Sequence, residues 1–364
     1  MAARVVVAVG TKKGLFTLEG SAGSKKLALR GPFFPGMPVS AALIDRRGRT
    51  PRVVAAPSST WFGTTLQVSR DLGRKFKATK SAPAFAADDG RTLKNIWSLA
   101  PGNEKESYLC GIEPAALFQS GDGGDTWEKV AGITDHPHAR TWMPGNGGLC
   151  MHTILDHGGA LHLGISTGGH YASRDGAKSF APENKGVGVG FQPNNFPEFG
   201  QCVHKIAAHP SRPERLYMQN HGGFPEVPGV GVLRSDDQGR SWQIISKGLP
   251  SDFGFPIVVH PNDPDTIYVV PLEPMTRGCP GGKPTVWRSE DAGGSWKALT
   301  RGFPKKEAWF TVLRDAMDVD EGKRPSLWLG TTTGQLWRGR DGGEEWECVQ
   351  SSLPPIHCVK AAVV

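Results

Sequence analysis

The stretch SGDGGDTW, residues 120–127, decides how this chain folds, because its pattern recurs along the 364 residues at nearly even spacing. The pattern is Ser-x-Asp-x-Gly-x-Ser/Thr-Trp, and each stretch of this form is called the turn motif below. Copies begin at Ser69, Ser120, Ser173, Ser235, Ser289 and Gly339, at intervals of 51, 53, 62, 54 and 50 residues. Units of this length are typical of the four-stranded blades of a β-propeller. We therefore expect an all-β fold made of repeated blades.

Short apolar runs around each turn motif indicate the strands of a blade. In the unit of Ser120, runs at 108–112 and 116–119 precede the motif, and a third run at 127–130 follows it. A fourth run recurs with its own phase, at 39–44, 95–99, 150–155, 202–207, 255–259, 311–316 and 357–363. These runs predict seven first strands, one for each blade.

The two ends of the chain are expected to meet in one blade. The N-terminal segment 5–18 is similar to 327–337, which indicates a seventh unit with a decayed turn motif and no first strand of its own. The run 357–363 can supply that strand, and this pairing leaves no sheet edge exposed. The sequence thus predicts a seven-bladed β-propeller as a single domain over 1–364, with the ring closed by the C-terminal strand pairing with the N-terminal unit.

The turn motif has a structural interpretation. Its Asp is expected to cap backbone N–H groups of a hairpin turn, and its Gly to supply a positive φ angle. Ala177 is the exception at the glycine position. The motif aspartates are therefore expected to stabilise turns rather than to catalyse a reaction: Asp71, Asp122, Asp175, Asp237, Asp291 and Asp341.

Charge and cysteine usage narrow the class of protein. The net charge of +7 is spread along the chain without a patch of the size that nucleic acids require, and the apolar run at 5–9 is too short for a signal peptide or membrane span. The six cysteines show no CxxC spacing. We expect free thiols, a cytoplasmic location, no nucleic-acid or membrane partner, and a monomer or small homo-oligomer.

The turn motif resembles the Asp-box, or bacterial neuraminidase repeat, of sialidases, sortilin-like receptors and a photosystem II assembly factor. The resemblance covers nearly the whole chain and implies the propeller fold, whereas in those families the motif lies away from the ligand. A true sialidase is not expected, because the chain lacks the Phe/Tyr-Arg-Ile-Pro motif. Tyr108, Tyr217 and Tyr268 fall inside second strands and are expected in the core rather than as a nucleophile.

Departures from the repeat indicate where a site lies. Aligned first strands place His152 and His204 in register, with Cys150 and Cys202 two residues before them. These thiols are interpreted as buried packing residues, with a nucleophilic thiol as the alternative. Aligned second strands place Glu113, His221 and Glu273 at one level. Such positions line the mouth of a propeller channel.

Long insertions border the same sector and are expected to roof the site: 131–149, 183–201, 224–230 and 275–283. Four residues near them are candidates to bind substrate: Arg140, Trp142, Lys205 and Arg314.

Three functions are compatible with this set of residues. Three imidazoles and a carboxylate suit a divalent Zn, Fe or Mn ion held by His152, His204 and His221, with Glu113 or Glu273 as ligand or general base. That arrangement predicts a hydrolase or lyase acting on a small polar or anionic substrate. One alternative is a non-catalytic propeller that binds a protein or glycan on the loop-rich face. The other is a glycoside hydrolase that uses Glu113 and Glu273 as paired carboxylates.

Overall fold

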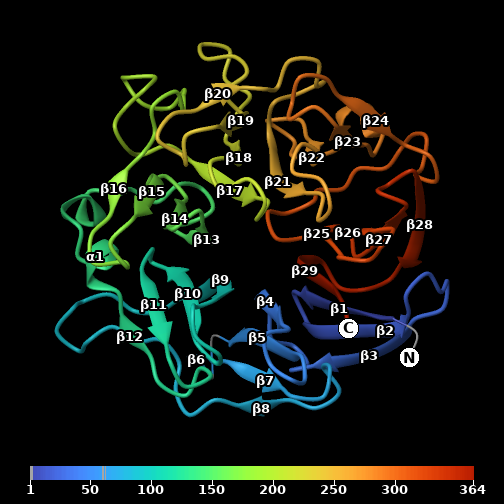
Figure 1. Cartoon of the computed structure of the whole chain (residues 1–364), viewed down its shortest axis with the longest axis horizontal. Coiled ribbons are helices and arrows are strands. Elements are labelled where there is room, and N and C mark those ends of the chain that lie inside the picture. Colours follow the sequence, from blue (N-terminus) through green and yellow to red (C-terminus); the bar gives the residue numbers. More distant parts are fainter. Residues whose placement is uncertain (1–2, 60, 62) are drawn as a thin grey trace.

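The computed structural model describes residues 3–59, 61 and 63–364. Within this part of the chain, seven antiparallel sheets surround a central channel like the blades of a propeller (Figure 1). Each sheet contains four strands in radial order, and one of them has a fifth, short strand. The predicted seven-bladed β-propeller is confirmed.

The blades follow one another along the sequence, and the strands of each run from the channel outward. The first contains β29 (Ile356–Val363), β1 (Arg4–Thr11), β2 (Gly14–Ser21) and β3 (Ala28–Phe33); the second β4 (Val39–Asp45), β5 (Arg52–Ser59), β7 (Gln67–Ser69) and β8 (Lys77–Ala78), with β6 (Gly63–Thr64) beside β5; the third β9 (Asn95–Pro101), β10 (Tyr108–Glu113), β11 (Leu117–Ser120) and β12 (Glu128–Lys129); the fourth β13 (Met151–His157), β14 (Ala160–Ile165), β15 (Gly169–Ser173) and β16 (Ala181–Pro182).

The remaining blades have the same plan. The fifth contains β17 (Val203–Ala208), β18 (Leu216–Asn220), β19 (Val232–Ser235) and β20 (Gln243–Ile244); the sixth β21 (Gly254–Val259), β22 (Ile267–Pro271), β23 (Val286–Ser289) and β24 (Lys297–Leu299); the seventh β25 (Met317–Val319), β26 (Leu327–Gly330), β27 (Leu336–Arg340) and β28 (Glu345–Gln350). Short helical turns lie between blades or in loops: α1 (Ala131–Thr134), η1 (Pro137–Arg140) and η2 (Pro280–Gly282). No helix of the described residues has the length and apolar character needed to cross a bilayer.

The ring is closed as the sequence predicts. Strand β29 pairs antiparallel with β1, from Val5 opposite Val363 to Thr11 opposite Ile356, and completes the first blade. Figure 1 shows this red C-terminal strand beside the blue N-terminal strands. Because β29 is the innermost strand of a blade that otherwise comes from the N-terminus, the ends of the chain hold the ring together.

A β-bulge recurs near the start of the innermost strands. In three blades a single residue is left without a partner in the ladder to the second strand: Trp97, His152 and His204. In the sixth blade the irregularity falls between Gly254 and Ile257, and therefore includes Phe255. The predicted alignment of His152 with His204 is thus confirmed, and bulges are known to redirect side chains next to binding sites.

The seventh blade differs from the prediction. Its innermost strand is β25, whereas the expected run 311–316 is not assigned as a strand apart from a parallel bridge between Asp315 and Cys358. The Ala316 N–H donates to the Leu313 carbonyl at 3.0 Å, which makes a turn and delays the ladder until Met317. Arg314 lies in this turn, and its guanidinium packs over the Phe255 ring of the sixth blade.

Five of the six turn motifs form the predicted capped hairpins. In the third blade the Gly124 N–H donates to Ser120 Oγ at 2.9 Å, and the Thr126 N–H donates to Asp122 Oδ1 at 2.9 Å. Equivalent bonds from the motif Ser and Asp recur in four other blades. Gly124 has a φ of 94° and Ala177 one of 67°, so both lie in the left-handed region. The Asp side chains of these five motifs are therefore occupied in holding the turns. Asp341 makes no such hydrogen bond among the described residues, because its motif begins with Gly339 in place of Ser, and it lies 4.0 Å from Arg324 instead.

Candidate site at the channel mouth

Glu113 lies at the end of β10, where the second strand reaches the channel mouth. Its Oε2 accepts a hydrogen bond from Trp97 Nε1 at 2.9 Å and one from Cys150 Sγ at 3.6 Å. Its side chain is 16% exposed, and Lys94 Nζ is 4.0 Å from Oε1. A Cβ on Gly148 would lie 2.5 Å from Oε1, so the absence of a side chain at that position makes room for the carboxylate. Glu113 is therefore a positioned carboxylate with partial access to solvent.

Two arginines from the sixth and seventh blades contribute positive charge to the same region. The Arg314 guanidinium lies over the Phe255 ring at 5.1 Å, and that of Arg277 lies over Phe253 at 4.7 Å. Burial and the charge of Arg314 lower the pKa of Arg277. A Cβ on Gly147 would be 3.7 Å from Arg314 Nη2, so this guanidinium reaches the loop next to Glu113. The mouth thus combines a carboxylate with two guanidinium groups.

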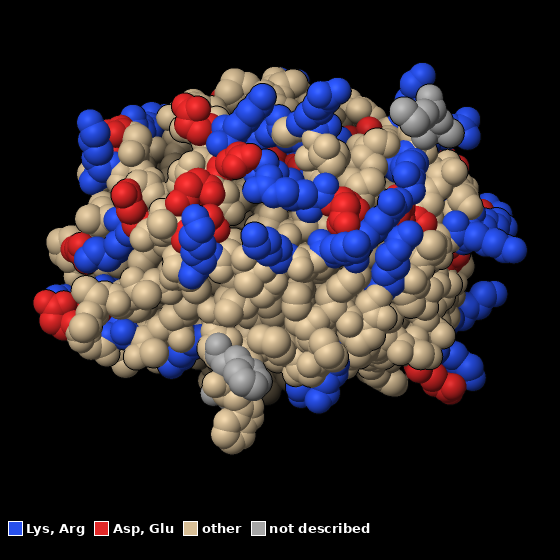
Figure 2. All heavy atoms as spheres, turned by 90° about the horizontal axis from the view of Figure 1, so that it is seen from below, with Lys and Arg blue, Asp and Glu red and all other residues tan. Residues whose placement is uncertain are grey.

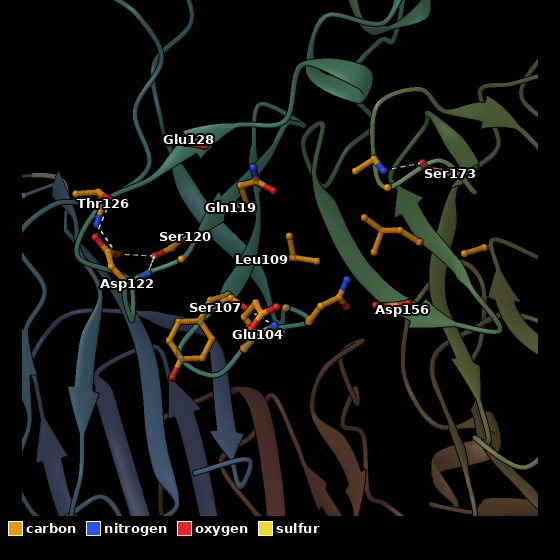
Figure 3. Close-up of a pocket in the computed structure, with 18 of the residues that line it drawn as sticks. Glu104, Ser107, Leu109, Gln119, Ser120, Asp122, Thr126, Glu128, Asp156 and Ser173 are labelled. Atoms are coloured by element: carbon orange, nitrogen blue, oxygen red, sulfur yellow. Dashed lines mark hydrogen bonds between the residues drawn. The ribbon is translucent and has the colours of Figure 1, made fainter.

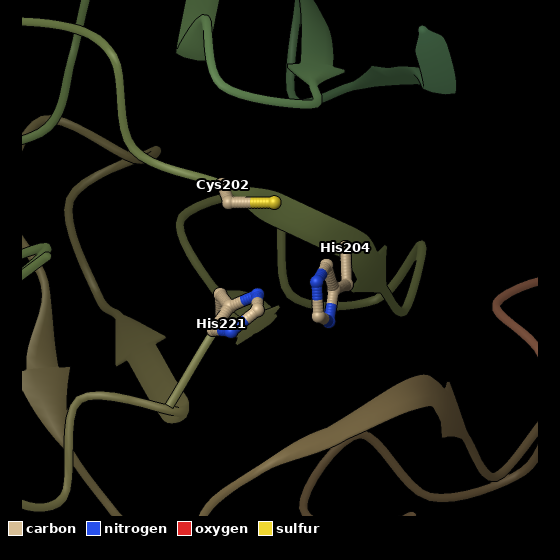
Figure 4. A group of neighbouring side chains, drawn as sticks. All are labelled: Cys202, His204 and His221. Atoms are coloured by element: carbon tan, nitrogen blue, oxygen red, sulfur yellow. The ribbon is translucent and has the colours of Figure 1, made fainter. Parts of the chain in front are cut away.

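Three potential metal ligands meet at the mouth end of the fifth blade. Cys202 comes directly before β17, His204 lies in β17 and His221 follows β18. Their ligand atoms all lie within 4.8 Å of one another (Figure 4). Burial, followed by the charge of Arg314, lowers the pKa of His204 well below its ordinary value, and burial, Arg277 and Arg314 lower that of His221 to about 4. Both rings are therefore neutral at pH 7, as metal binding requires.

His152 is fully buried and does not belong to this group. Neither of its ring nitrogens has a hydrogen-bond partner among the described residues. Burial, followed by the charges of Arg314 and Lys205, lowers its pKa well below the ordinary value. It lines a cavity of about 150 Å³. The structure therefore brings together two of the three predicted histidine ligands.

The other predicted substrate-binding residues lie apart from one another. Lys205 points into the channel, where it and Lys360 form ion pairs with Asp315. Trp142 is 5% exposed, and its Nε1 donates to the Tyr171 hydroxyl at 3.1 Å.

Arg140 is exposed at the end of η1. Glu273 follows β22 and is exposed, and its carbonyl accepts from the Arg277 N–H at 2.8 Å. Of the two predicted carboxylates, Glu113 is thus held by neighbouring side chains and Glu273 is open to solvent.

Cys202 is the potential ligand that the sequence interpretation missed. Its signal is the spacing Cys-x-His at the start of an innermost strand, which places a thiol two residues before His204. The preceding blade carries the same spacing in Cys150 and His152, but the position equivalent to His221 is Ser166. The backbone confirms this equivalence, since the N–H groups of Ser166 and His221 donate to the carbonyls of Cys150 and Cys202 at 2.8 and 2.9 Å.

Exposed apolar side chains gather on the loops of the mouth end. Six large ones lie in loops that follow a second strand or precede a first strand: Trp61, Met143, Phe191, Phe196, Met275 and Trp309. The opposite hairpins carry ion pairs such as Arg52 with Glu106 and Arg215 with Asp265. In side view, charged residues gather toward one edge of the ring and are sparse at the other (Figure 2). The two ends of the ring therefore differ in character.

A separate cavity of about 620 Å³ lies between the third and fourth blades (Figure 3). Its lining includes Ser120, Asp122 and Ser173 of the turn motifs, whose oxygens bond within their own turns. Hydrogen bonding lowers the pKa of Asp122 to about 2, chiefly through the Thr126 N–H and hydroxyl. This cavity is thus lined in part by structural carboxylates.

The fold and the mouth define a β-propeller whose functional groups lie at one end of the channel, and comparisons with known proteins agree with the fold. No family model matches the chain, so the relation to the Asp-box family stays a prediction. The structure is similar to the GH74 xyloglucanase from Xanthomonas campestris, with a TM-score of 0.61, 16% identity, and coverage of 98% of this chain and 52% of that one. It is also similar to a structure of YCF48 bound to D1 peptide, with a TM-score of 0.51, 14% identity, and coverage of 86% and 82%.

Two curated proteins are similar in sequence. A xyloglucanase of Paenibacillus sp is 25% identical over 309 residues, which covers 76% of this chain and 25% of that protein. An oligoxyloglucan-reducing end-specific xyloglucanase of Emericella nidulans is 23% identical over 335 residues, which covers 82% and 39%. This chain therefore spans well under half the length of the curated relatives that it matches.

Proposed function

We propose that this protein is a glycoside hydrolase that cleaves a glucan of the xyloglucan type at the channel mouth. The observation that carries the proposal is the sequence similarity to two xyloglucanases over 76% and 82% of the chain. It favours the paired-carboxylate alternative over a hydrolase or lyase whose reaction depends on a metal.

Glu113 is the residue to which we assign the first carboxylate role. Glycoside hydrolysis needs one carboxyl group that exchanges a proton with the glycosidic oxygen and a second that acts as nucleophile or activates water. The hydrogen bonds from Trp97 and Cys150 both reach Oε2 and so hold the carboxyl plane in place. This fixed, partly desolvated carboxylate suits general acid–base work.

Glu273 takes the second role in this proposal. It occupies the equivalent level three blades further on, and it is exposed at the same mouth. The Arg277 and Arg314 guanidinium groups lie in this part of the mouth and add positive charge to it. A glucan chain laid across the mouth would meet both carboxylates.

The exposed aromatic residues of the mouth suit a carbohydrate ligand. The flat apolar face of a pyranose ring packs on an aromatic side chain, because both surfaces are poorly hydrated. Trp309 is 61% exposed, while its ring lies close to the backbone of Gly278 and Gly282. It is therefore a rigid aromatic surface that remains open to a ligand.

The test is release of reducing ends from a panel of soluble polysaccharides. Xyloglucan, mixed-linkage β-glucan, carboxymethylcellulose and a sialylated glycan are incubated with the purified full chain. We expect new reducing ends from a β-glucan and none from the sialylated glycan. Binding of a glucan without any release would contradict hydrolysis and favour the non-catalytic propeller.

A further inference from the structure

We propose that Cys202, His204 and His221 bind one divalent zinc ion, with the fourth coordination position open toward the channel mouth. This site does not depend on the proposed glycosidase activity. Two imidazoles and a thiolate form a donor set that selects zinc over magnesium, calcium or manganese, because those three ions prefer oxygen ligands. The proposal rests on four features of the fifth blade.

The first feature is that the backbone brings the three residues together. The His221 N–H donates to the Cys202 carbonyl at 2.9 Å, which joins the end of β18 to the start of β17. His204 is the bulged residue of β17, opposite the step between Asn220 and Gln219. A bulge turns its side chain toward the two neighbours, as Figure 4 shows.

The second feature is the hydrogen bond that orients His204. Its Nδ1 lies 2.6 Å from the Gly254 carbonyl oxygen. Because a carbonyl only accepts hydrogen bonds, Nδ1 carries the proton and Nε2 keeps a lone pair. Metal-binding histidines usually donate their second nitrogen to a carbonyl or carboxylate in this way. The tautomer of His204 is therefore the one that a metal at Nε2 requires.

The third feature is the aromatic packing that holds both rings. His221 stacks on Phe224 with centroids 5.1 Å apart and meets Phe253 edge-on at 5.0 Å. His204 packs against Phe255 at 4.8 Å. Aromatic neighbours fix the rings without using their nitrogen atoms. The Ser166 hydroxyl lies 3.8 Å from Cys202 Sγ, where it can donate to a thiolate.

The fourth feature is the spacing of the ligand atoms. They lie within 4.8 Å of one another, whereas ligand atoms around a tetrahedral zinc ion lie about 3.3 to 3.6 Å apart, so the side chains would have to close by about 1 Å. Small side-chain rotations therefore suffice to bring all three onto one ion. The charges of Arg277 and Arg314 oppose a bare dication, and the Cys202 thiolate offsets part of this repulsion. The same guanidinium groups suit an anionic oxygen ligand at the open position.

The experiment uses cobalt as a spectroscopic probe of thiolate ligation in the metal-free, reduced full chain. Cobalt chloride is titrated into the protein, and zinc chloride is then added in competition. We expect one equivalent of cobalt, visible bands of a tetrahedral ion, a near-ultraviolet thiolate-to-cobalt charge-transfer band, and loss of all bands on adding zinc. The equivalent thiol of the preceding blade supplies the matched control variant, Cys150→Ser.

Cys202→Ser is expected to abolish the charge-transfer band and to weaken cobalt binding at least ~100-fold, more than the loss of an outer-sphere partner does. Cys150→Ser is expected to retain both. His221→Gln, at a half-buried position, provides a second ligand variant that weakens binding if Cys202→Ser fails to fold. The proposal is overturned if the wild-type chain takes up no stoichiometric cobalt, or if the band survives Cys202→Ser. Polysaccharide cleavage is measured separately, so that failure of one proposal does not decide the other.

Discussion

Ala177 is an L-residue held in a conformation that the other turn motifs give to glycine. Its φ is 67°, while Gly73, Gly124, Gly239, Gly293 and Gly343 have φ between 78° and 94° at the same position. The Ala177 N–H still donates to Ser173 Oγ at 3.0 Å, so the turn keeps its hydrogen bond despite the backbone strain. The strain is a local cost that a single substitution can remove.

We expect Ala177→Gly to raise the free energy of unfolding by about 0.5 kcal/mol, since relief of the left-handed strain exceeds the lost methyl burial and the greater freedom of glycine in the unfolded chain. The matched change Gly124→Ala is expected to lower it by about 1 kcal/mol. Urea unfolding at constant pH measures both. A lower free energy of unfolding for Ala177→Gly together with a higher one for Gly124→Ala would show that the turns are not strained as described.

Glu19 is a buried carboxylate surrounded by arginines. Its side chain is 2% exposed and forms ion pairs with Arg4, Arg30 and Arg74. Burial alone would raise its pKa, but the hydrogen bonds from Arg74 and Arg30 and the charge of Arg4 outweigh this and lower the pKa below the ordinary value of 4.5. Arg74 lies within the turn motif of the second blade, so the contact joins two blades.

Because the folded-state pKa is depressed, the stability that Glu19 contributes is fully present above pH 4.5 and is lost as the pH falls through the folded-state pKa. We expect Glu19→Gln to cost about 1 to 2 kcal/mol at pH 7, a value reduced for the solvent exposure of the arginines. The difference from wild type should shrink as the pH falls below 4.5. Thermal unfolding over that range is the measurement, and a constant difference would contradict this interpretation.

The residues of the site were only partly predictable from the sequence. The alignment of His152 with His204 was possible because the innermost strands repeat, and the repeated bulge confirms it. Which histidines meet depends on contacts between blades, such as the hydrogen bond from His204 to Gly254, and these have no local signal. Cys202 was interpreted as a packing residue because a buried thiol is common in cores.

At the level of elements, β29 carries the closure of the ring. It pairs with β1 on one side, and its Val359 N–H donates to the Asp315 carbonyl of the seventh blade at 2.7 Å. Its side chains Ile356, Cys358 and Val359 are fully buried. The sequence predicted this strand because the N-terminal unit lacks a first strand and the run 357–363 is the seventh run of that kind, whereas the turn at 313–316 that delays β25 has no such repeat to indicate it.

A chain that ends at Pro355 is expected to lose cooperative folding. Burial of Ile356 and Val359 alone contributes about 3 to 5 kcal/mol, which is comparable to the whole stability of many domains, and the exposed edge of β1 would favour aggregation. A peptide of residues 356–364 supplied in trans is expected to restore a folding transition. Guanidinium unfolding followed by circular dichroism measures this. An unchanged midpoint for the truncated chain would contradict the closure role of β29.

At the level of the whole molecule, the residues that stabilise the ring and the residues of the candidate site lie at different places. The turn motifs and ion pairs occupy the rim and the end opposite the mouth, while the insertions place exposed aromatic side chains around the channel opening. Repeats could predict the number and order of blades, because each blade repeats the same pattern. They could not predict a substrate, because the residues that we propose to bind it are those that depart from the repeat.

Trp309→Ala is expected to weaken binding of soluble xyloglucan by about three- to tenfold, as the loss of one aromatic stacking surface does, with little change in stability. Ile244→Ala removes an exposed apolar side chain from an outer strand, and should leave binding unchanged. Affinity electrophoresis in xyloglucan-containing gels compares the two. Equal retardation of both variants would show that the mouth is not the glucan surface.

We propose above all that glycosidase activity depends on Glu113. The most direct test measures how fast the variant Glu113→Gln releases reducing ends from xyloglucan. The glutamine keeps the shape of the side chain but cannot exchange a proton, so kcat should fall by about 10²- to 10⁴-fold. Glu128→Gln changes an exposed carboxylate on the outer strand β12 and serves as the control, with wild-type kcat expected. Equal rates for wild type and Glu113→Gln, or no release by the wild-type chain, would contradict the account.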